Sequence, residues 1–257
     1  MQVDLDGKVA FVAGSTSGIG KAVALKLARN QADIVLNGRN SAQAEEVIKE
    51  IGQIGRNVIF EKADITNYRE VAQAMQNAVA KLGKVDILVA SGGINKTGIR
   101  PTFFHETDPI DYLSIAKNQW WSRLYCIKAI LAHMIKRKTG KIVMVTTDAG
   151  RWPTPAESVV GGAAAAVMLG TKVLAQELAR WQIRINTVST TVIKDSASLQ
   201  YVSRSSPSLA HVFTRAFEKQ PFPTTVEDVA EACLFLASPE AHGITGQVLS
   251  VNGGLSF

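Results

Sequence analysis

Seven short apolar runs rich in β-branched residues recur along the chain, and amphipathic stretches lie between most of them. The runs are Val9–Ala13, Ile34–Asn37, Val58–Glu61, Asp86–Ala90, Ile142–Thr146, Ile183–Val188 and Gln247–Val251. Helical spacing of apolar residues is found in Lys21–Asn30, Ala42–Ile54, Arg69–Leu82, Ile110–Lys138 and Ala163–Arg180. Continuous apolar strands that alternate with amphipathic helices are typical of βαβ units. The pattern therefore predicts an α/β fold, a doubly wound parallel sheet of about seven strands with helices on both faces.

The alternation indicates a single domain over residues 1–257, because no linker rich in Pro, Gly or Ser interrupts it. One stretch departs from the pattern: Ser196–Pro223 has mixed polarity and three prolines. In an open α/β sheet, an excursion near the carboxyl ends of the strands usually covers the substrate. We therefore expect a substrate lid at about residues 195–223.

Composition narrows the class of protein. Apolar residues make up 46% of the chain and charged residues 19%, which is typical of a globular protein. The longest uncharged, mostly apolar run, Val159–Gly170, is too short to cross a bilayer, and Asp4 and Asp6 precede any apolar run, unlike in a signal peptide. Two cysteines are too few for a disulfide framework, so we expect a cytoplasmic protein without a membrane partner. The net charge of +6 is spread along the chain and His and Cys residues do not cluster, so neither nucleic acid nor a metal is expected.

A glycine-rich segment follows the first predicted strand, and a helix opens directly from it. Its residues are Gly14, Ser15, Thr16, Ser17, Gly18, Ile19 and Gly20. Glycines let the backbone approach a pyrophosphate, and the helix N-terminus offers unpaired N–H groups and the positive end of the dipole. A glycine-rich turn also suits a tight loop without a ligand. Its place after the first strand favours nucleotide binding by a Rossmann-like domain.

The G-x-x-x-G-x-G spacing resembles that of the short-chain dehydrogenase/reductase family, and the resemblance covers essentially the whole chain. Gly243–Gly254 is similar to the family's C-terminal strand and turn. The resemblance implies cofactor contacts after the later strands, at Asp64, Ile65, Ser91, Gly92, Gly93 and Ile193. It also implies a homo-oligomer, a dimer or tetramer, assembled through the helix that contains Asn118 and the Ala-rich helix near Ala163.

The end of the second strand favours NADP(H) over NAD(H). An acidic side chain there would bind the ribose 2′-hydroxyl of NAD, whereas Arg accommodates the 2′-phosphate of NADP. Gly38 stands where the acidic residue would be, and Arg39 follows it. A solvated surface Arg is the alternative reading of Arg39. Ser17 weakens the case for NADP(H), because NADP-preferring relatives often carry a basic residue at that point.

The catalytic pattern of the family is incomplete in this chain. In the family, Ser holds the substrate oxygen, Tyr transfers a proton, Lys lowers the Tyr pKa and binds the ribose, and Asn assists. The resemblance implies that Thr147 takes the Ser position and Asn118 the Asn position. The Tyr and Lys positions fall on Val160 and Ala164, and neither Tyr nor Lys occurs between Ile142 and Thr171. Loss of an acid group alone typically costs about 10²–10⁴ in rate.

Two functions stay open for a chain of this kind. The first is an enzyme that reduces an activated C=C bond of a small molecule, an enone or enoyl group, where hydrogen bonds from Thr147 and Asn118 stabilise the enolate oxyanion. Some atypical family members that lack the Tyr carry out this reaction. Replacement proton donors near in sequence are Asp148, Glu157, Ser158, Tyr201 and His211. Each of these residue types is more often merely a solvated side chain, and the sequence favours none of them. The second is a silent NADP(H)-binding protein, or the partner subunit of an active homologue.

Overall fold

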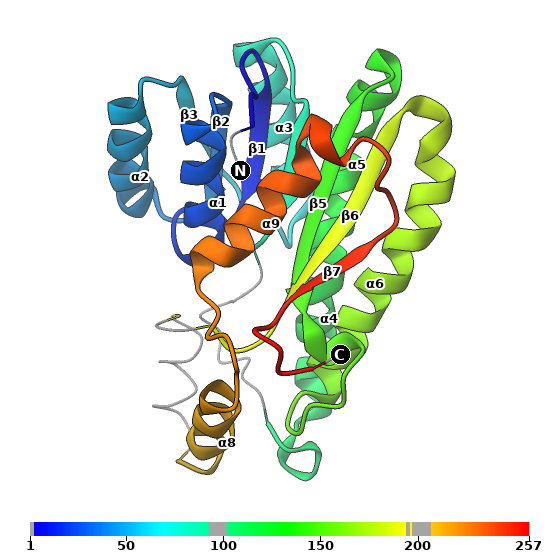
Figure 1. Ribbon diagram of the computed structural model, residues 1–257. Coiled ribbons are helices and arrows are strands. Elements are labelled where there is room, and N and C mark those ends of the chain that lie inside the picture. Colours follow the sequence, from blue (N-terminus) through cyan, green and yellow to red (C-terminus); the bar gives the residue numbers. More distant parts are fainter. Residues whose placement is uncertain (1–2, 93–101, 194–195, 197–206, 257) are drawn as a thin grey trace.

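Seven parallel strands form one sheet in a computed structural model that describes residues 3–92, 102–193, 196 and 207–256 (Figure 1). The strands are β1 (Val9–Ala13), β2 (Asp33–Gly38), β3 (Val58–Lys62), β4 (Ile87–Ala90), β5 (Gly140–Thr147), β6 (Ile183–Thr190) and β7 (Val248–Val251). Their order is β3-β2-β1-β4-β5-β6-β7, and every neighbouring pair is parallel. The predicted Rossmann-like doubly wound sheet is confirmed.

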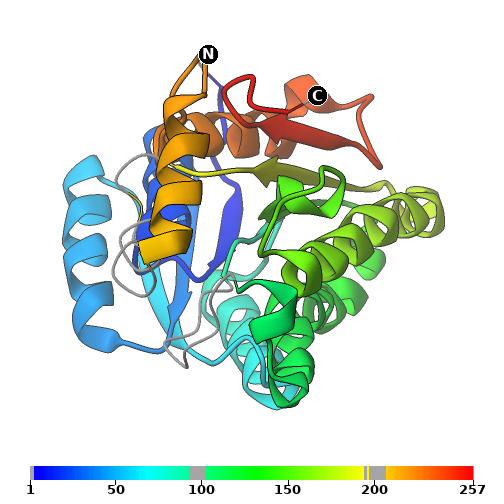
Figure 2. The same cartoon turned by 90° about the horizontal axis from the view of Figure 1, so that it is seen from below.

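Helices cover both faces of this sheet (Figures 1 and 2). The α-helices in the described ranges are α1 (Gly18–Arg29), α2 (Ser41–Ile54), α3 (Tyr68–Leu82), α4 (Tyr112–Ala116), α5 (Ser122–Arg137), α6 (Ser158–Leu178), α8 (Pro207–Glu218) and α9 (Val226–Ala237). One hydrophobic cluster joins the sheet to α1, α2 and α9, and a second joins it to α3, α5 and α6. The sheet is therefore the middle of three layers.

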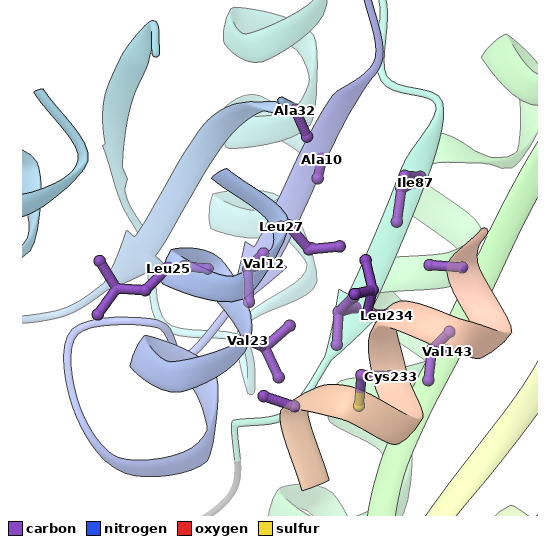
Figure 3. Close-up of a cluster of buried hydrophobic side chains, with 14 of the residues drawn as sticks. Ala10, Val12, Val23, Leu25, Leu27, Ala32, Ile87, Val143, Cys233 and Leu234 are labelled. Atoms are coloured by element: carbon purple, nitrogen blue, oxygen red, sulfur yellow. The ribbon is translucent and has the colours of Figure 1, made fainter. Parts of the chain in front are cut away.

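The strand β1 shows how the sequence builds both clusters at once. Successive side chains of a strand point to opposite faces. Ala10 and Val12 accordingly lie in the cluster with α1 and α9, and Phe11 lies in the other (Figure 3). All three are at most 1% exposed. Full burial of a large apolar side chain contributes about 1.5–3 kcal/mol, which is why the central strands are apolar on both faces.

The predicted helix Ile110–Lys138 is interrupted in the structure. Between α4 and α5 lies a π-helical turn, Lys117–Trp121, which contains Asn118. The main-chain oxygen of Asn118 accepts hydrogen bonds from the Ser122 hydroxyl and the Arg123 guanidinium, each of 2.6 Å. These side-chain donors satisfy a carbonyl in the widened turn, a common cause of helix distortion that often occurs at functional sites.

The helix that contains the apolar run Val159–Gly170 is longer than that run. Together with the following 3-10 turn it spans Ser158–Trp181, 24 residues that are long and apolar enough to cross a membrane by length and composition. Within the fold, α6 packs against β5, β6 and the 3-10 turn η4 (Asp148–Gly150). Its apolar face is thus part of the protein core.

The predicted lid at about 195–223 is described only in part, since residues 194–195 and 197–206 lie outside the described residues. The described part includes α8, which lies beyond the end of the sheet from which the β1 loop enters α1 (Figure 1). That end carries the carboxyl ends of the parallel strands, where open α/β sheets bind their ligands.

Candidate cofactor and substrate site

The glycine loop after β1 has the close packing that a dinucleotide site requires. A Cβ on Gly14 would lie 2.5 Å from the Cα of Gly92, and a Cβ on Gly20 would lie 2.2 Å from the main-chain oxygen of Gly14. Gly14 and Gly18 have φ of +68° and +54°, the left-handed region that glycine tolerates. The loop, the start of α1 and the turn after β4 therefore approach one another at the backbone.

The N-terminus of α1 is open to an anion. Ser17 occupies the N-cap position, and its side chain makes no capping hydrogen bond. The first N–H groups of a helix have no intrahelical partner, and next to Gly18 no atom lies where a Cβ would reach. This space and these donors fit the pyrophosphate of a nicotinamide dinucleotide.

Asn37 ties the glycine loop to the neighbouring strands, and the sequence analysis did not single it out. It is 1% exposed. Its side-chain oxygen accepts from the Gly14 N–H (3.3 Å), and its side-chain amide donates to the main-chain oxygen of Glu61 (3.0 Å). Its backbone exchanges hydrogen bonds with Ser15, whose N–H donates to the Asn37 oxygen and whose Oγ accepts from the Asn37 N–H. The sequence feature that could have identified Asn37 is its position as a polar residue at the end of an apolar strand.

Arg39 was predicted to contact the 2′-phosphate of NADP and Asp64 the adenine, and the two residues lie side by side. The Arg39 guanidinium is 3.8 Å from the Asp64 carboxylate, and both side chains are partly solvent-exposed. The hydroxyl of Thr66 donates to the same carboxylate (2.8 Å) and fixes its orientation. At Gly38 a Cβ would lie 2.7 Å from Cγ2 of Thr16, so an acidic side chain there requires a shift of Thr16.

The turn after β4 adds the next predicted contacts. Ser91 donates to the main-chain oxygen of Ala13 (2.7 Å), and a Cβ on Gly92 would lie 2.4 Å from Cδ1 of Ile65. Gly93 lies outside the described residues. Ile193, after β6, is 4% exposed and belongs to the hydrophobic cluster with α1 and α9.

Thr147 and Asn118 come from different elements at the same end of the sheet. Thr147 ends β5, and its hydroxyl donates to Oε2 of Glu157 (3.4 Å) while accepting from the Ala149 N–H (3.3 Å). Asn118 is 5% exposed, and within the described part of the chain its side-chain oxygen has no hydrogen-bond partner. An unpartnered buried amide oxygen is costly unless a ligand or water meets it.

A pocket of about 450 Å³ lies where the N-terminus of α6 meets the η4 turn. Its lining residues are Ala149, Pro153, Thr154, Pro155, Glu157, Ser158, Gly161 and Gly162. A Cβ on Gly161 would lie 2.6 Å from the Ala149 oxygen, so Gly161 lets helix and turn pack closely below the pocket. Burial raises the pKa of Glu157 to about 7, against the lowering effect of its hydrogen bond from Thr147.

The other predicted proton donors differ in their surroundings: one is buried in a hydrogen-bond network, and others lie at the pocket or on the surface. Asp148 is buried, and burial would raise its pKa, but hydrogen bonds from Ser189 (2.5 Å), Asn252 (2.6 Å), Ser250 (2.8 Å) and Ser256 (3.1 Å) hold the pKa below its usual value. Asp148 is therefore an ionised anchor for the C-terminal turn. Ser158 lines the pocket, His211 is exposed on α8, and Tyr201 lies outside the described residues.

Arg123 is a second residue that sequence reasoning missed. It is 4% exposed, and burial lowers its pKa to about 10. Its guanidinium donates to the main-chain oxygens of Asn118 and Val145, and no ion pair links it to a carboxylate in the described ranges. The sequence did indicate that Arg123 is buried, because helical spacing places it on the same face of α5 as the buried Cys126 and Ile130. No group of three or more potential metal ligands occurs among the described residues.

Comparisons with known proteins match this chain over nearly its full length, and they all indicate the same family. The enoyl-(acyl carrier protein) reductase family model matches residues 13–256. A 3-oxoacyl-(acyl-carrier-protein) reductase of Synechocystis sp. is 32% identical over 98% of each chain, and one of Chlamydia pneumoniae is 29% identical over 100% of each. A solved 7α-hydroxysteroid dehydrogenase complexed with NADH and 7-oxo glycochenodeoxycholic acid has a TM-score of 0.89 at 29% identity, covering 98% of this chain and 96% of the other. Matched by the family model and by relatives from end to end, the protein belongs to the short-chain dehydrogenase/reductase family.

Proposed function

We propose that the protein is a reductase that uses NADP(H) in preference to NAD(H), has a non-standard active site, and reduces an activated C=C bond of an enone or enoyl substrate. One observation carries this proposal. In the register set by Thr147, Val160 and Ala164 stand at the positions of the family's Tyr and Lys. Neither side chain transfers a proton, so the usual carbonyl reduction is disfavoured.

The proposed cofactor contacts follow the loops at the carboxyl ends of the strands. Gly14–Gly20 holds the pyrophosphate, Arg39 the 2′-phosphate, and Asp64 with Ile65 the adenine. Ser91, Gly92, Gly93 and Ile193 complete the cofactor site. Reduced nicotinamide supplies a hydride, which is one hydrogen with two electrons.

Thr147 and Asn118 are the proposed catalytic residues. In conjugate reduction, hydride addition to the β-carbon moves the π electrons toward the carbonyl oxygen, which becomes an enolate oxyanion. The Thr147 hydroxyl and the Asn118 side-chain amide supply hydrogen bonds to that oxygen. The burial of Asn118, which is 5% exposed, supports this role; its unpartnered side-chain oxygen is an acceptor and does not contact the oxyanion. The description of the matching family model, an enoyl reductase, supports the choice of a C=C bond.

A silent NADP(H)-binding protein or partner subunit is the second candidate. It is favoured by the close packing of α6 on the η4 turn. A Cβ on Gly150 would lie 2.9 Å from the Cβ of Ala164, which is fully buried. Small residues at this contact serve packing and need no catalytic explanation.

Cofactor titration and an acceptor screen separate these candidates. NADPH and NADH are titrated against intrinsic Trp fluorescence, and NADPH is expected to bind more tightly. NADPH consumption is then followed with cyclohexenone, a crotonyl thioester and cyclohexanone. If the proposal is right, NADPH is consumed with cyclohexenone or with the crotonyl thioester. Tight NADPH binding with no turnover of any acceptor would favour the silent protein, and tighter binding of NADH would contradict the role of Arg39.

We also propose a homo-oligomer, a dimer or tetramer, in the cytoplasm. An apolar groove of about 330 Å³ between α5 and α6 supports the assembly. Its lining residues are Leu124, Tyr125, Ile127, Lys128, Leu131 and Leu174. Next to it on α6, Leu169 is 66% exposed and Val173 48%. Light scattering after size exclusion should give an oligomer, and Leu131→Glu with Leu174→Glu should give monomers.

A further inference from the structure

Glu157 lies where two features of the candidate site meet. Glu157 is one of the residues that line the 450 Å³ pocket, and Oε2 of its carboxyl group lies 3.4 Å from the Thr147 hydroxyl, within hydrogen-bond distance. The side chain is partly buried, on the residue that precedes α6. A carboxyl group on a pocket-lining residue, in contact with the hydroxyl assigned to the substrate oxygen, is placed for proton transfer.

We propose that Glu157 and Thr147 form a proton relay that replaces the family's tyrosine and delivers a proton to the substrate oxygen; this rests on the proposed reductase function. In the relay, the protonated Glu157 carboxyl reverses the hydrogen bond between the two residues and donates to the Thr147 oxygen. The Thr147 hydroxyl is then free to give its proton to the substrate oxygen while Glu157 gives its own proton to Thr147. Glu157 thus acts through Thr147 and positions the transferred proton.

The reaction balances with one hydride, one proton and no further reagent. The hydride and its two electrons form the C–H bond at the β-carbon, and the C=C π pair moves to form the enolate. The O–H bond of the Glu157 carboxyl breaks and leaves a carboxylate, while the substrate becomes an enol that tautomerises to the saturated ketone. Water then returns a proton to Glu157, so one NADPH and one proton are consumed per turnover.

The surroundings of Glu157 support a protonated carboxyl group near neutral pH. Within the described ranges, the charged side chains near this element are Asp148 and Arg151 at the η4 turn and Lys117 on the π-helical turn. The exposed His105 and Glu106 follow Thr102, whose N–H donates to the Ala156 oxygen. Asp148 is occupied by hydrogen bonds from β6 and the C-terminal turn, and Arg151 contacts both Ser250 and Asp148. Lys117 is exposed. Burial therefore dominates, and it raises the pKa of Glu157 to about 7.

A first experiment tests the proton itself and needs no substrate. The wild-type protein is labelled with ¹³C at the glutamate side-chain carboxyls, and their chemical shifts are followed from acid to alkaline pH. One resonance should titrate near pH 7, and it should be missing in Glu157→Gln. If every glutamate titrates in its ordinary range, Glu157 is ionised at neutral pH and the relay is excluded.

A second experiment tests the transfer with whichever acceptor the wild type reduces. Glu157→Gln keeps the shape of the side chain but has no acidic proton, and it should lower kcat about 10²-fold or more. Thr147→Val should do the same, whereas Thr147→Ser, which keeps the hydroxyl, should retain most of the activity. In the wild type kcat should fall as pH rises above about 7, and this decline should vanish in Glu157→Gln.

The control is Glu177→Gln, which removes an exposed carboxylate from α6, the helix that follows Glu157, and should leave the rate and its pH profile unchanged. NADPH binding and melting temperature are measured for every variant, so a folding defect is recognised directly. If the wild type turns over and Glu157→Gln matches its rate and pH profile, the relay is wrong while the reductase function stands. If the wild type consumes no NADPH with any acceptor, the reductase function fails and the relay with it.

Discussion

Arg123 donates a hydrogen bond of 2.6 Å from its guanidinium to the main-chain oxygen of Asn118, inside the π-helical turn. A second hydrogen bond of 3.1 Å reaches the main-chain oxygen of Val145 on β5. The buried cation therefore links the turn that carries Asn118 to the strand that ends at Thr147. This link holds the two proposed catalytic residues in a fixed relation.

Arg123→Met should destabilise the protein, because it leaves the Val145 oxygen buried without a donor. The expected loss is about 1–3 kcal/mol in the free energy of unfolding, measured by urea denaturation. Arg29→Met, at an exposed position on α1, is the control and should stay within about 0.5 kcal/mol of the wild type. Equal stabilities of the two variants would show that the guanidinium hydrogen bonds contribute nothing.

Arg39→Ala should weaken NADPH binding and spare NADH binding. A hydrogen bond to a charged group contributes about 1.5–3 kcal/mol, so Kd for NADPH should rise roughly 10-fold or more. Trp fluorescence titration measures both cofactors. Arg69→Ala, an exposed arginine at the start of α3, is the matched control. A parallel loss for NADPH and NADH would mean that Arg39 does not contact the 2′-phosphate.

Gly20→Ala should disrupt the cofactor loop. The new Cβ would lie 2.2 Å from the main-chain oxygen of Gly14, so the backbone of the loop must move. We expect a lower melting temperature together with loss of NADPH binding. Gly52→Ala is the control, because no atom lies near its Cβ position in α2. There the substitution should stabilise the helix by roughly 0.5–1 kcal/mol.

Asp148→Asn should reduce stability at neutral pH more than in acid. The pKa of Asp148 is lowered in the folded chain, so its carboxylate stabilises the fold above the unfolded-state pKa of about 3.9, and this contribution is lost as pH falls through the lower folded value. The expected difference at neutral pH is about 1.5–3 kcal/mol. The melting temperatures of the wild type and Asp148→Asn should therefore approach one another progressively as pH falls below about 3.9. With the exposed Asp111 changed to Asn no such convergence is expected.

Restoring Val160→Tyr together with Ala164→Lys should introduce ketone reduction. The two positions are one helical turn apart on α6, so the new phenol and amine would lie on the same face of that helix. NADPH consumption with cyclohexanone measures the gain. The single variants serve as controls, and a folded, NADPH-binding double variant that never reduces ketones would contradict the register counted from Thr147.

The sequence predicts the sheet well because its central strands are unusually continuous in apolar residues. Phe11 and Val12 are both buried, on opposite faces, and only a parallel sheet covered by helices on both sides accommodates such a run. The close-packed turn after β1 was equally predictable from its glycines, whereas its role in cofactor binding stays a prediction. Its glycines are required by backbone contacts, such as that between Gly14 and Gly92, that few other residues tolerate.

The π-helical turn and the environment of Glu157 could not be predicted from the sequence. The apolar spacing continues through Lys117–Trp121, and the turn depends on donors from Ser122 and Arg123 that act only once the helix is packed. Glu157 is separated from Thr147 by a loop, and its burial depends on how that loop folds back onto β5. Sequence reasoning therefore named Glu157 among the donors without distinguishing it from Asp148.

The strand order brings residues from distant parts of the chain to one edge of the sheet. Gly14 follows β1, Arg39 follows β2, Asp64 follows β3, Ser91 follows β4 and Thr147 ends β5. No short fragment of the chain contains this set, so the proposed dinucleotide site exists only in the fully assembled sheet. Occupancy of that site should therefore be thermodynamically linked to global unfolding: ligand at about 100 times its Kd adds about 2.7 kcal/mol to the unfolding free energy, and we expect coenzyme supply to affect how long the chain stays folded.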